Sequence, residues 1–217
     1  MIRIVIVDDH DLVREGIRAL LEQDPIFQVV GETGDGQEAI RLATRLRPDV
    51  LLMDVSLPGG IGGLEATEAI VADCPGVKVI ILTQYEHREY ITRAIRIGAR
   101  GYLLKRSVAA QLKDAIKTVY QGQRYLHPAA AEELADLVAT GTSLEEDDYD
   151  RLTPREKQVF KLLAEGKTSR DIAKYLTISL KTAMTHRTNL MAKLNMHSRA
   201  ELIRYAIRKA IISLEGP

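Results

Sequence analysis

The stretch VLLMDVSLP, residues 50–58, places one carboxylate between a short apolar run and a turn. A continuous apolar run of this length is typical of a strand buried on both faces, as in a parallel sheet. Open α/β sheets place their chemistry at the carboxyl ends of the strands. Asp54 is therefore a candidate reactive carboxylate, although an Asp at a strand end more often caps a turn.

The composition is that of a globular protein. The 217 residues are enough for one large domain or two small ones, and 46% are hydrophobic and 28% charged. No apolar run reaches membrane-spanning length, and residues 1–7 resemble a strand rather than a signal peptide, so we expect a cytoplasmic protein. One cysteine excludes an internal disulfide and a Cys-rich zinc site, and the five histidines lack metal-ligand spacing.

The zero net charge hides an uneven distribution. Residues 1–127 hold 16 basic and 17 acidic residues, residues 128–150 hold 8 acidic residues and no basic one, and residues 151–217 hold 14 basic and 5 acidic residues. A nearly neutral body, an acidic connector and a basic tail indicate two domains, the second of which meets a polyanion. We predict domains at 1–121 and 151–217, joined by a linker at 122–150.

Residues 1–121 alternate strand and helix patterns. Apolar runs of strand length lie at 2–7, 27–30, 50–53, 77–82 and 101–104, and amphipathic helical patterns lie at 11–23, 36–46, 63–73, 87–97 and 108–121. Five such repeats predict a doubly wound, five-stranded parallel sheet with helices on both faces.

Polar residues with complementary chemistry follow the predicted strands. Asp8 and Asp9 end the first strand, Asp54 the third and Thr83 the fourth, and Lys105 follows the fifth. Three carboxylates at one rim repel one another unless a cation lies among them, and Mg²⁺ suits an all-oxygen site that also binds phosphate. Lys105 adds a charge for a phosphoryl oxygen, which leaves Asp54 as a carboxylate nucleophile.

This pattern resembles the receiver domain of bacterial two-component response regulators over residues 1–121. The resemblance implies that Asp54 is the phosphate acceptor and that Asp9, Asp54 and the backbone carbonyl of Ser56 hold Mg²⁺, with Asp8 in support. It also implies that Thr83 and Tyr102 reorient on phosphorylation and that a sensor histidine kinase supplies the phosphoryl group. The glycine-rich loop at 58–64 is one residue longer than is usual in receivers.

Two other patterns in this part of the chain have simpler explanations. Residues 34–39, GDGQEA, match a dinucleotide-binding fingerprint, but that reading leaves the acidic pair, Thr83 and Lys105 without roles. His10 follows the acidic pair, and a single histidine at a helix start is more often an exposed polar residue than a metal ligand. We therefore favour neither a nucleotide site nor a histidine ligand.

The basic tail has a helical period throughout. Capping boxes at 153–156 and 198–201 start its first and last helices, and short helices at about 168–176 and 179–193 fit a helix-turn-helix. The result is an all-α, four-helix domain. In the third helix, Lys181, Met184, Thr185 and Thr188 share one face, near Lys193, that suits the major groove of double-stranded DNA.

Residues 151–212 closely resemble the LuxR-type helix-turn-helix, and joined to a receiver they indicate the NarL–FixJ family of response regulators. The resemblance implies phosphate contacts from Lys181 and Thr182 and base contacts from Met184, Thr185 and Thr188. It also implies a homodimer on DNA through the last helix, whose Ile203, Ile207 and Ile211 would form an apolar seam. Met184 departs from the lysine that is common there, which favours readout through thymine methyls and DNA shape.

The leading interpretation is a transcription regulator that is phosphorylated on Asp54 and is not an enzyme acting on outside substrates. An aspartyl-phosphate phosphatase would need a second Asp at position 56, where this chain has Ser56. A signalling adaptor without DNA binding is the third possibility, because Met184 offers bases no bidentate hydrogen bonds.

Overall fold

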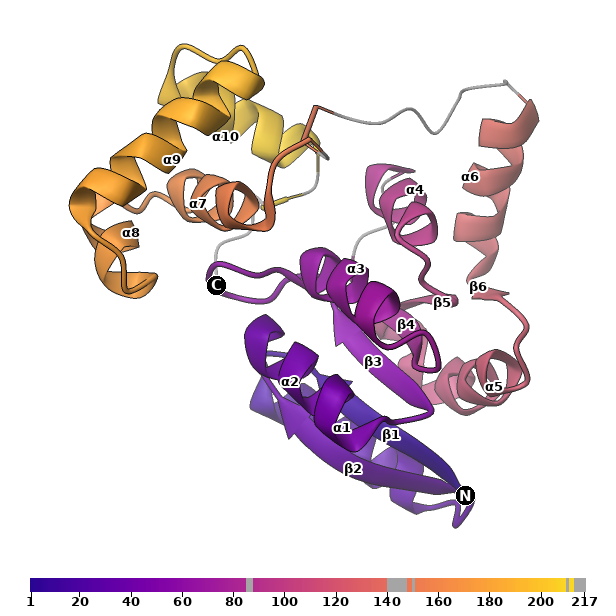
Figure 1. The fold of residues 1–217 in the computed structure, drawn as a ribbon. Helices are drawn as coiled ribbons and strands as arrows, with labels where there is room; N and C mark the ends of the chain where they lie inside the picture. Colours follow the sequence, from indigo (N-terminus) through magenta and orange to yellow (C-terminus); the bar gives the residue numbers. More distant parts are fainter. Residues whose placement is uncertain (85–87, 140–147, 150, 210, 213–217) are drawn as a thin grey trace. The chain divides into compact units, whose positions relative to one another are not determined.

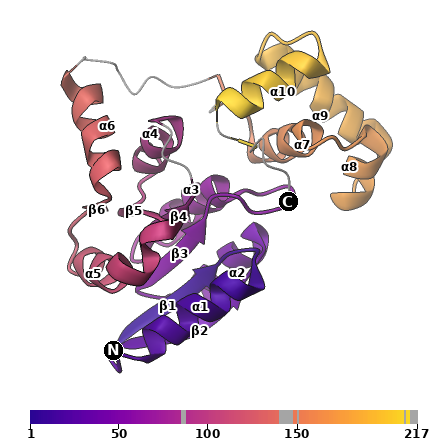
Figure 2. The ribbon, with the colours of Figure 1, turned by 180° about the vertical axis from the view of Figure 1, so that it is seen from behind.

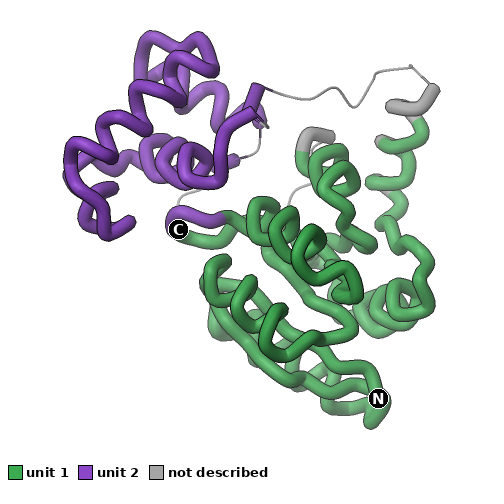
Figure 3. Tube along the Cα trace, viewed as in Figure 1, with its two compact units in different colours: residues 1–58, 62–143 green, residues 59–61, 144–217 purple. Residues whose placement is uncertain are grey.

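A computed structural model describes residues 1–84, 88–139, 148–149, 151–209 and 211–212. The chain divides into two compact units, residues 1–58 with 62–143 and residues 59–61 with 144–217 (Figure 3). Each unit is described by itself below. Across the described residues, the helices are too short or too polar to cross a lipid bilayer.

A parallel sheet forms the centre of the first unit (Figure 1). Its order is β2-β1-β3-β4-β5-β6, and the strands are β1 (Ile2–Val7), β2 (Phe27–Thr33), β3 (Val50–Asp54), β4 (Lys78–Thr83), β5 (Gly101–Leu104) and β6 (Tyr125–Leu126). The buried apolar run of β3 lies between β1 and β4, where both of its faces are covered. The doubly wound parallel sheet expected from the sequence is therefore confirmed.

Helices cover both faces of this sheet (Figure 2). They are α1 (Asp11–Glu22), α2 (Gly36–Leu46), α3 (Gly63–Asp73), α4 (Arg88–Arg96) and α5 (Val108–Tyr120), followed by α6 (Pro128–Ala139). One core cluster joins α1 and α5 to the even-numbered residues of β1, β3 and β4, while α2 and α3 contact each other on the opposite face. This arrangement leaves the carboxyl ends of the strands as a polar rim.

Local chemistry sets the helix ends. The Asp35 side chain accepts a hydrogen bond from the Glu38 N–H and starts α2, as an N-cap should. The same helix ends at Arg47, which has a left-handed φ of 45° directly before Pro48. Residues next to each end of α2 therefore fix where the helix begins and ends.

The sixth strand was not expected. The sequence predicts five strands and a linker from residue 122, whereas β6 pairs with β5 through Tyr125 and Leu126. The backbone N–H of His127 also donates to the carbonyl of Tyr102. Two residues carry too little periodicity for a strand to be recognised, and the open edge of β5 supplies the pairing only in the folded chain.

The second unit contains the four helices predicted from the sequence. They are α7 (Pro154–Ala164), α8 (Ser169–Tyr175), α9 (Leu180–Lys193) and α10 (Arg199–Arg208). Thr153 and Glu156 form the predicted capping box at the start of α7. At α10, Ser198 caps the N–H of Glu201, and the Glu201 carboxylate accepts a hydrogen bond from the N–H of His197.

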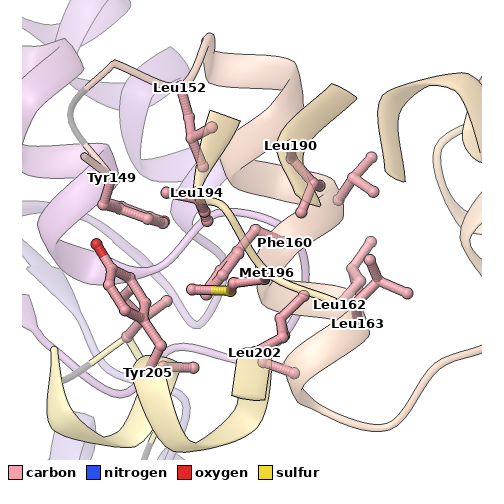
Figure 4. Close-up of a cluster of buried hydrophobic side chains, with 14 of the residues drawn as sticks. Tyr149, Leu152, Phe160, Leu162, Leu163, Leu190, Leu194, Met196, Leu202 and Tyr205 are labelled. Atoms are coloured by element: carbon pink, nitrogen blue, oxygen red, sulfur yellow. The ribbon is translucent and has the colours of Figure 1, made fainter. Parts of the chain in front are cut away.

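An aromatic core holds these helices together (Figure 4). Phe160 of α7 is fully buried and meets the rings of Tyr149 and Tyr205 edge to face, at centroid distances of 5.3 and 6.0 Å. Tyr149 lies in the segment predicted to be a linker, yet only 2% of it is exposed. The end of that acidic segment thus contributes to the core of the second unit.

Candidate functional site

Three carboxylates from two neighbouring strands meet at the rim of the first unit. Val7 pairs with Met53 across β1 and β3, so the residues that follow them, Asp8 and Asp54, lie side by side. Asp8 is fully buried and Asp54 is 1% exposed, while Asp9 keeps some contact with solvent. Burial raises the pKa of the Asp54 carboxyl, and although Lys105 lowers it, the result stays above the ordinary value.

Lys105 joins two of these carboxylates. Its Nζ lies 2.7 Å from Asp8 Oδ2 and 2.9 Å from Asp54 Oδ2. Burial works against the ammonium charge, but Asp54 and Asp8 together raise the pKa of Lys105 above its ordinary value. The cation therefore stays charged and holds one side of the rim, as the sequence predicted.

Thr83 and Tyr102 lie on adjacent strands near this rim. Both side chains are buried, and they hydrogen-bond to each other. Burial raises the pKa of the Tyr102 phenol, and the bond to Thr83 only partly opposes that shift. A change at the rim that moves Thr83 would therefore break or remake a bond to Tyr102.

His10 has contacts that the sequence did not indicate. It is exposed, as expected, but its Nδ1 lies 2.8 Å from Asp9 Oδ1 and 3.3 Å from Asp8 Oδ1. Its backbone N–H also donates to Asp8 Oδ1 at 3.0 Å. In the sequence, the only sign of these contacts is that His10 directly follows Asp8 and Asp9. That position shows that His10 is near the carboxylates, but not that its ring faces them.

The rim offers the donors of a cation site. Ligand atoms of Asp8, Asp9, His10 and Asp54 all lie within 4.8 Å of one another. Asp9 Oδ1 is buried with only the His10 ring beside it, and Asp8 Oδ2 is buried with only Lys105 beside it. Such oxygens suit a divalent ion, because buried carboxylate oxygens need a charged partner.

Gly63 packs closely against the backbone at the end of β3, next to the rim. A Cβ atom at this position would lie 1.8 Å from the carbonyl oxygen of Asp54, and the Gly63 N–H donates to the carbonyl of Val55. The Asp54 carboxylate also accepts a hydrogen bond from the Ser56 N–H at 3.2 Å. Only glycine permits this close approach of the start of α3 to the end of β3.

Five of the six predicted DNA-contacting residues lie on one exposed surface of α9. An open, shallow surface is lined by Leu180, Lys181, Met184, Thr185, Thr188 and Asn189, and Thr182 is exposed beside it. Met184 is 55% exposed. The hydroxyl of Thr185 donates to the carbonyl of Lys181, so its methyl group and the acceptor side of its oxygen are left for a partner. Leu180 and Asn189 were not singled out from the sequence.

Lys193 is placed differently from the other predicted DNA contacts. Its Nζ lies 2.7 Å from the Glu156 carboxylate, which is nearly buried and also closes the capping box of α7. Although burial opposes ionisation, the bonds from Lys193 and Thr153 hold the pKa of Glu156 below its ordinary value. Lys193 thus ties α9 to α7, a role that needs tertiary contacts to be seen.

The apolar seam expected on α10 is only partly available. Ile203 and Ile207 are half-buried and lie one turn apart on the same face. Ile211 is 8% exposed and belongs to the core of the second unit, so the expectation that it joins the seam is wrong. The turn after α10 directs it inward.

Comparison with known proteins covers nearly the whole chain. Residues 4–117 match the response regulator receiver domain, and residues 150–206 match the luxR family of bacterial regulatory proteins. The chain is 38% identical over 214 residues to the oxygen regulatory protein NreC of Staphylococcus carnosus, covering 97% of this chain and 99% of the relative. It is 39% identical over 214 residues to the transcriptional regulatory protein LiaR of Bacillus subtilis, covering 98% and 100%.

Solved structures agree with these matches. The response regulator RcsB of Salmonella typhimurium matches with a TM-score of 0.60 and 28% identity, covering 94% of this chain and 98% of that one. An RcsB–DNA complex matches with a TM-score of 0.59 and 28% identity, covering 96% and 98%. A LuxR-family response regulator from Aurantimonas is 39% identical over 64% of this chain and 99% of its own, with a TM-score of 0.60.

Proposed function

Since the chain belongs to the NarL–FixJ family of two-component response regulators, we propose that Asp54 is its phosphate acceptor and α9 its DNA-reading helix. The family regulates transcription in response to phosphorylation and is not enzymatic. The single observation that carries the residue assignment is the contact of Lys105 with both Asp8 and Asp54. The Lys105 ammonium thereby joins residues at the ends of three strands, β1, β3 and β5.

The phosphoryl transfer follows from the chemistry of the rim. A carboxylate oxygen of Asp54 attacks phosphorus while the bond from phosphorus to the histidine nitrogen of a sensor kinase breaks, and the electron pair stays on that nitrogen. Lys105 then has a phosphoryl oxygen within its reach and exchanges part of its contact with Asp54 for that oxygen. Thr83 supplies a hydroxyl beside it, and its bond to Tyr102 relays the change.

Mg²⁺ fits the donor set, which is rich in carboxylate oxygens. Asp9, Asp54 and the backbone carbonyl of Ser56 would hold it, with Asp8 in support, and it would neutralise the charge that develops on the phosphoryl oxygens. Asp9 Oδ1 is buried and has only the His10 ring beside it, which supports this assignment. Ser56 in place of a second Asp disfavours phosphatase chemistry on outside substrates.

The exposed surface of α9 is suited to a DNA groove. Lys181 and Thr182 would contact phosphates, whereas Met184, Thr185 and Thr188 present mainly apolar or methyl groups to base edges. Lys193 is paired with Glu156 although its side chain is 42% exposed, so a phosphate contact from Lys193 would compete with this ion pair. Promoter DNA is the partner, and we accordingly place the protein in the cytoplasm.

A homodimer on DNA is the natural assembly. The half-buried Ile203 and Ile207 of α10 offer a small self-complementary seam, and one comparison structure contains two RcsB dimers bound to DNA. Phosphorylation turns the Asp54 carboxylate, of charge −1, into an acyl phosphate of about −2, and this added charge lies at the rim rather than at the seam. Since the two changes occur at different places, dimer formation through the seam would raise DNA affinity in addition to any effect of phosphorylation at the rim.

The phosphorylation test is a mass measurement. With acetyl phosphate and Mg²⁺ the parent protein should gain about 80 Da, the mass of one phosphoryl group. Asp54→Asn should gain nothing, whereas Asp73→Asn, which changes an exposed carboxylate on α3, should behave as the parent does. An equal gain in the Asp54 variant would disprove the assignment.

The DNA test uses salt. Lys181→Ala should weaken binding similarly on all promoter fragments and lower the slope of log affinity against log salt by about 1, as expected for one lost phosphate contact. Thr188→Ala should instead alter the preference among fragments. An unchanged salt slope for the lysine variant would remove α9 from the proposed interface.

A further inference from the structure

We propose that His10 is a nitrogen ligand of the rim's cation site and shifts its preference from Mg²⁺ toward divalent transition-metal ions such as Mn²⁺. This inference rests on the proposed metal site at Asp8, Asp9 and Asp54. It concerns a residue with no part in the phosphoryl chemistry described above. The group that ties it to the site is a ring nitrogen facing two carboxylates.

The spacing of the donors fits neighbouring ligands of one ion. In an octahedral site with bonds of about 2.1 Å, adjacent ligand atoms are about 3.0 Å apart. His10 Nδ1 lies 2.8 Å from Asp9 Oδ1 and 3.3 Å from Asp8 Oδ1, which are values on either side of that edge length. Both distances therefore fit a His10 Nδ1 that shares one face of an octahedron with these two oxygens.

Lys105 leaves this face open. Its Nζ contacts the Oδ2 atoms of Asp8 and Asp54, whereas His10 faces the Oδ1 atoms of Asp8 and Asp9. The fully buried Asp8 carboxylate thus separates the lysine from the histidine. Its Oδ1 already accepts the His10 backbone N–H and keeps a second lone pair for an ion.

His10 could bind an ion without breaking a hydrogen bond that caps α1. It is the N-cap residue of α1, its side chain makes no capping bond, and its side chain is 58% exposed. The imidazole therefore has no role in capping α1, and it remains accessible to an ion from solvent. Relative to Mg²⁺, which prefers oxygen and keeps its waters, an imidazole ligand favours divalent transition-metal ions, and among them Mn²⁺ gains least.

A simpler role for His10 makes the opposite prediction. If the ring only donates a hydrogen bond to the carboxylates, an ion must displace it. Removal of the ring would then leave Mn²⁺ and Mg²⁺ binding unchanged or would strengthen both. If the ring is a ligand, its removal weakens Mn²⁺ binding selectively.

The experiment titrates the full-length protein with Mn²⁺ and follows the free ion by EPR, with Mg²⁺ added in competition. Pulsed EPR of the bound Mn²⁺ should show coupling to an imidazole nitrogen in the parent protein. His10→Ala and His10→Asn should lose that coupling and weaken Mn²⁺ binding by about tenfold, with a smaller change for Mg²⁺. His197→Ala, which removes an exposed histidine from the second unit, should match the parent.

Two results would overturn the inference. One is the absence of nitrogen coupling in the parent, and the other is Mn²⁺ binding in His10→Ala that is as tight as in the parent. Asp9→Asn separates this failure from that of the proposed metal site. If Asp9→Asn loses both ions while His10→Ala loses neither, the acidic site stands and only the histidine ligand is wrong; if Asp9→Asn binds both normally, both proposals fail.

Discussion

The two units present their functional groups in opposite ways. In the first, Asp8, Asp54 and Thr83 are essentially buried at the ends of strands, and the two carboxylates depend on Lys105 for charge balance. In the second, the residues proposed to read DNA are exposed on one helix, and Met184 is 55% exposed. The first site combines residues from several strands, whereas the second consists of exposed residues on a single helix.

This difference has a physical origin. Phosphoryl chemistry needs fixed charges in a site of low dielectric constant, so the carboxylates are buried although burial disfavours their ionisation. DNA is too large to be enclosed, so its contacts must project from the surface, and burial in the second unit serves packing and a structural ion pair instead. Substitutions of site residues in the first unit should therefore change both function and stability. Substitutions of the exposed α9 residues in the second unit should change DNA binding with little effect on stability.

Phe160→Ala should have the largest effect. It removes the ring that joins Tyr149 and Tyr205, and such a change costs about 3–5 kcal/mol, close to the whole stability of a unit of this size. DNA binding should be lost while Asp54 still accepts phosphate, as followed by gel shift and by mass. Phe27→Ala, in the core of the first unit, is the reciprocal control; loss of both activities in each variant would show that the units do not fold separately.

Gly63→Ala should damage the first site specifically. The added Cβ would lie 1.8 Å from the Asp54 carbonyl oxygen, so β3 or α3 must shift, at a cost of about 1–3 kcal/mol and with loss of phosphorylation. Gly16→Ala, in α1 with open space around its position, should stabilise the protein by up to about 1 kcal/mol. Thermal unfolding and acetyl phosphate labelling measure both variants, and normal labelling of Gly63→Ala would mean that the rim tolerates movement.

Glu156→Gln tests the structural ion pair of the second unit. Loss of the charged bonds to Lys193 and Thr153 should cost about 1.5–3 kcal/mol. Because the pKa of Glu156 is lowered in the folded state, its contribution is present above the unfolded value of 4.5 and disappears as pH falls through the folded value. Urea unfolding at several pH values should show this acid loss in the parent and not in the variant; equal pH dependence would assign it to other groups.

Met184→Ala should have the smallest effect on stability. Its side chain is exposed on α9, so unfolding should change by less than about 0.5 kcal/mol. Affinity for a promoter fragment should still fall by about 1 kcal/mol where a thymine methyl lies under the side chain. Affinities across fragments with single thymine replacements measure this; a uniform loss on every fragment would indicate that Met184 reads no base.

The helices and most strands were predictable because their signals are local. The apolar run of β3 and the capping box at Thr153 each act within a few residues, and each lies where the sequence predicts it. The two-residue β6 has no such signal, since it depends on the free edge of β5. Tyr149 likewise sits in an acidic stretch whose composition suggests a solvated segment.

The sequence by itself determined which polar residues stand at strand ends and which side chains share the exposed face of α9, because both follow from fixed backbone periods. Only the tertiary structure decided their partners. In the folded protein the His10 ring faces the carboxylates of Asp8 and Asp9, Lys193 pairs with Glu156, and Ile211 lies in the core of the second unit. Partner choice depends on side-chain direction and on residues distant in the chain, and neither is contained in a local pattern.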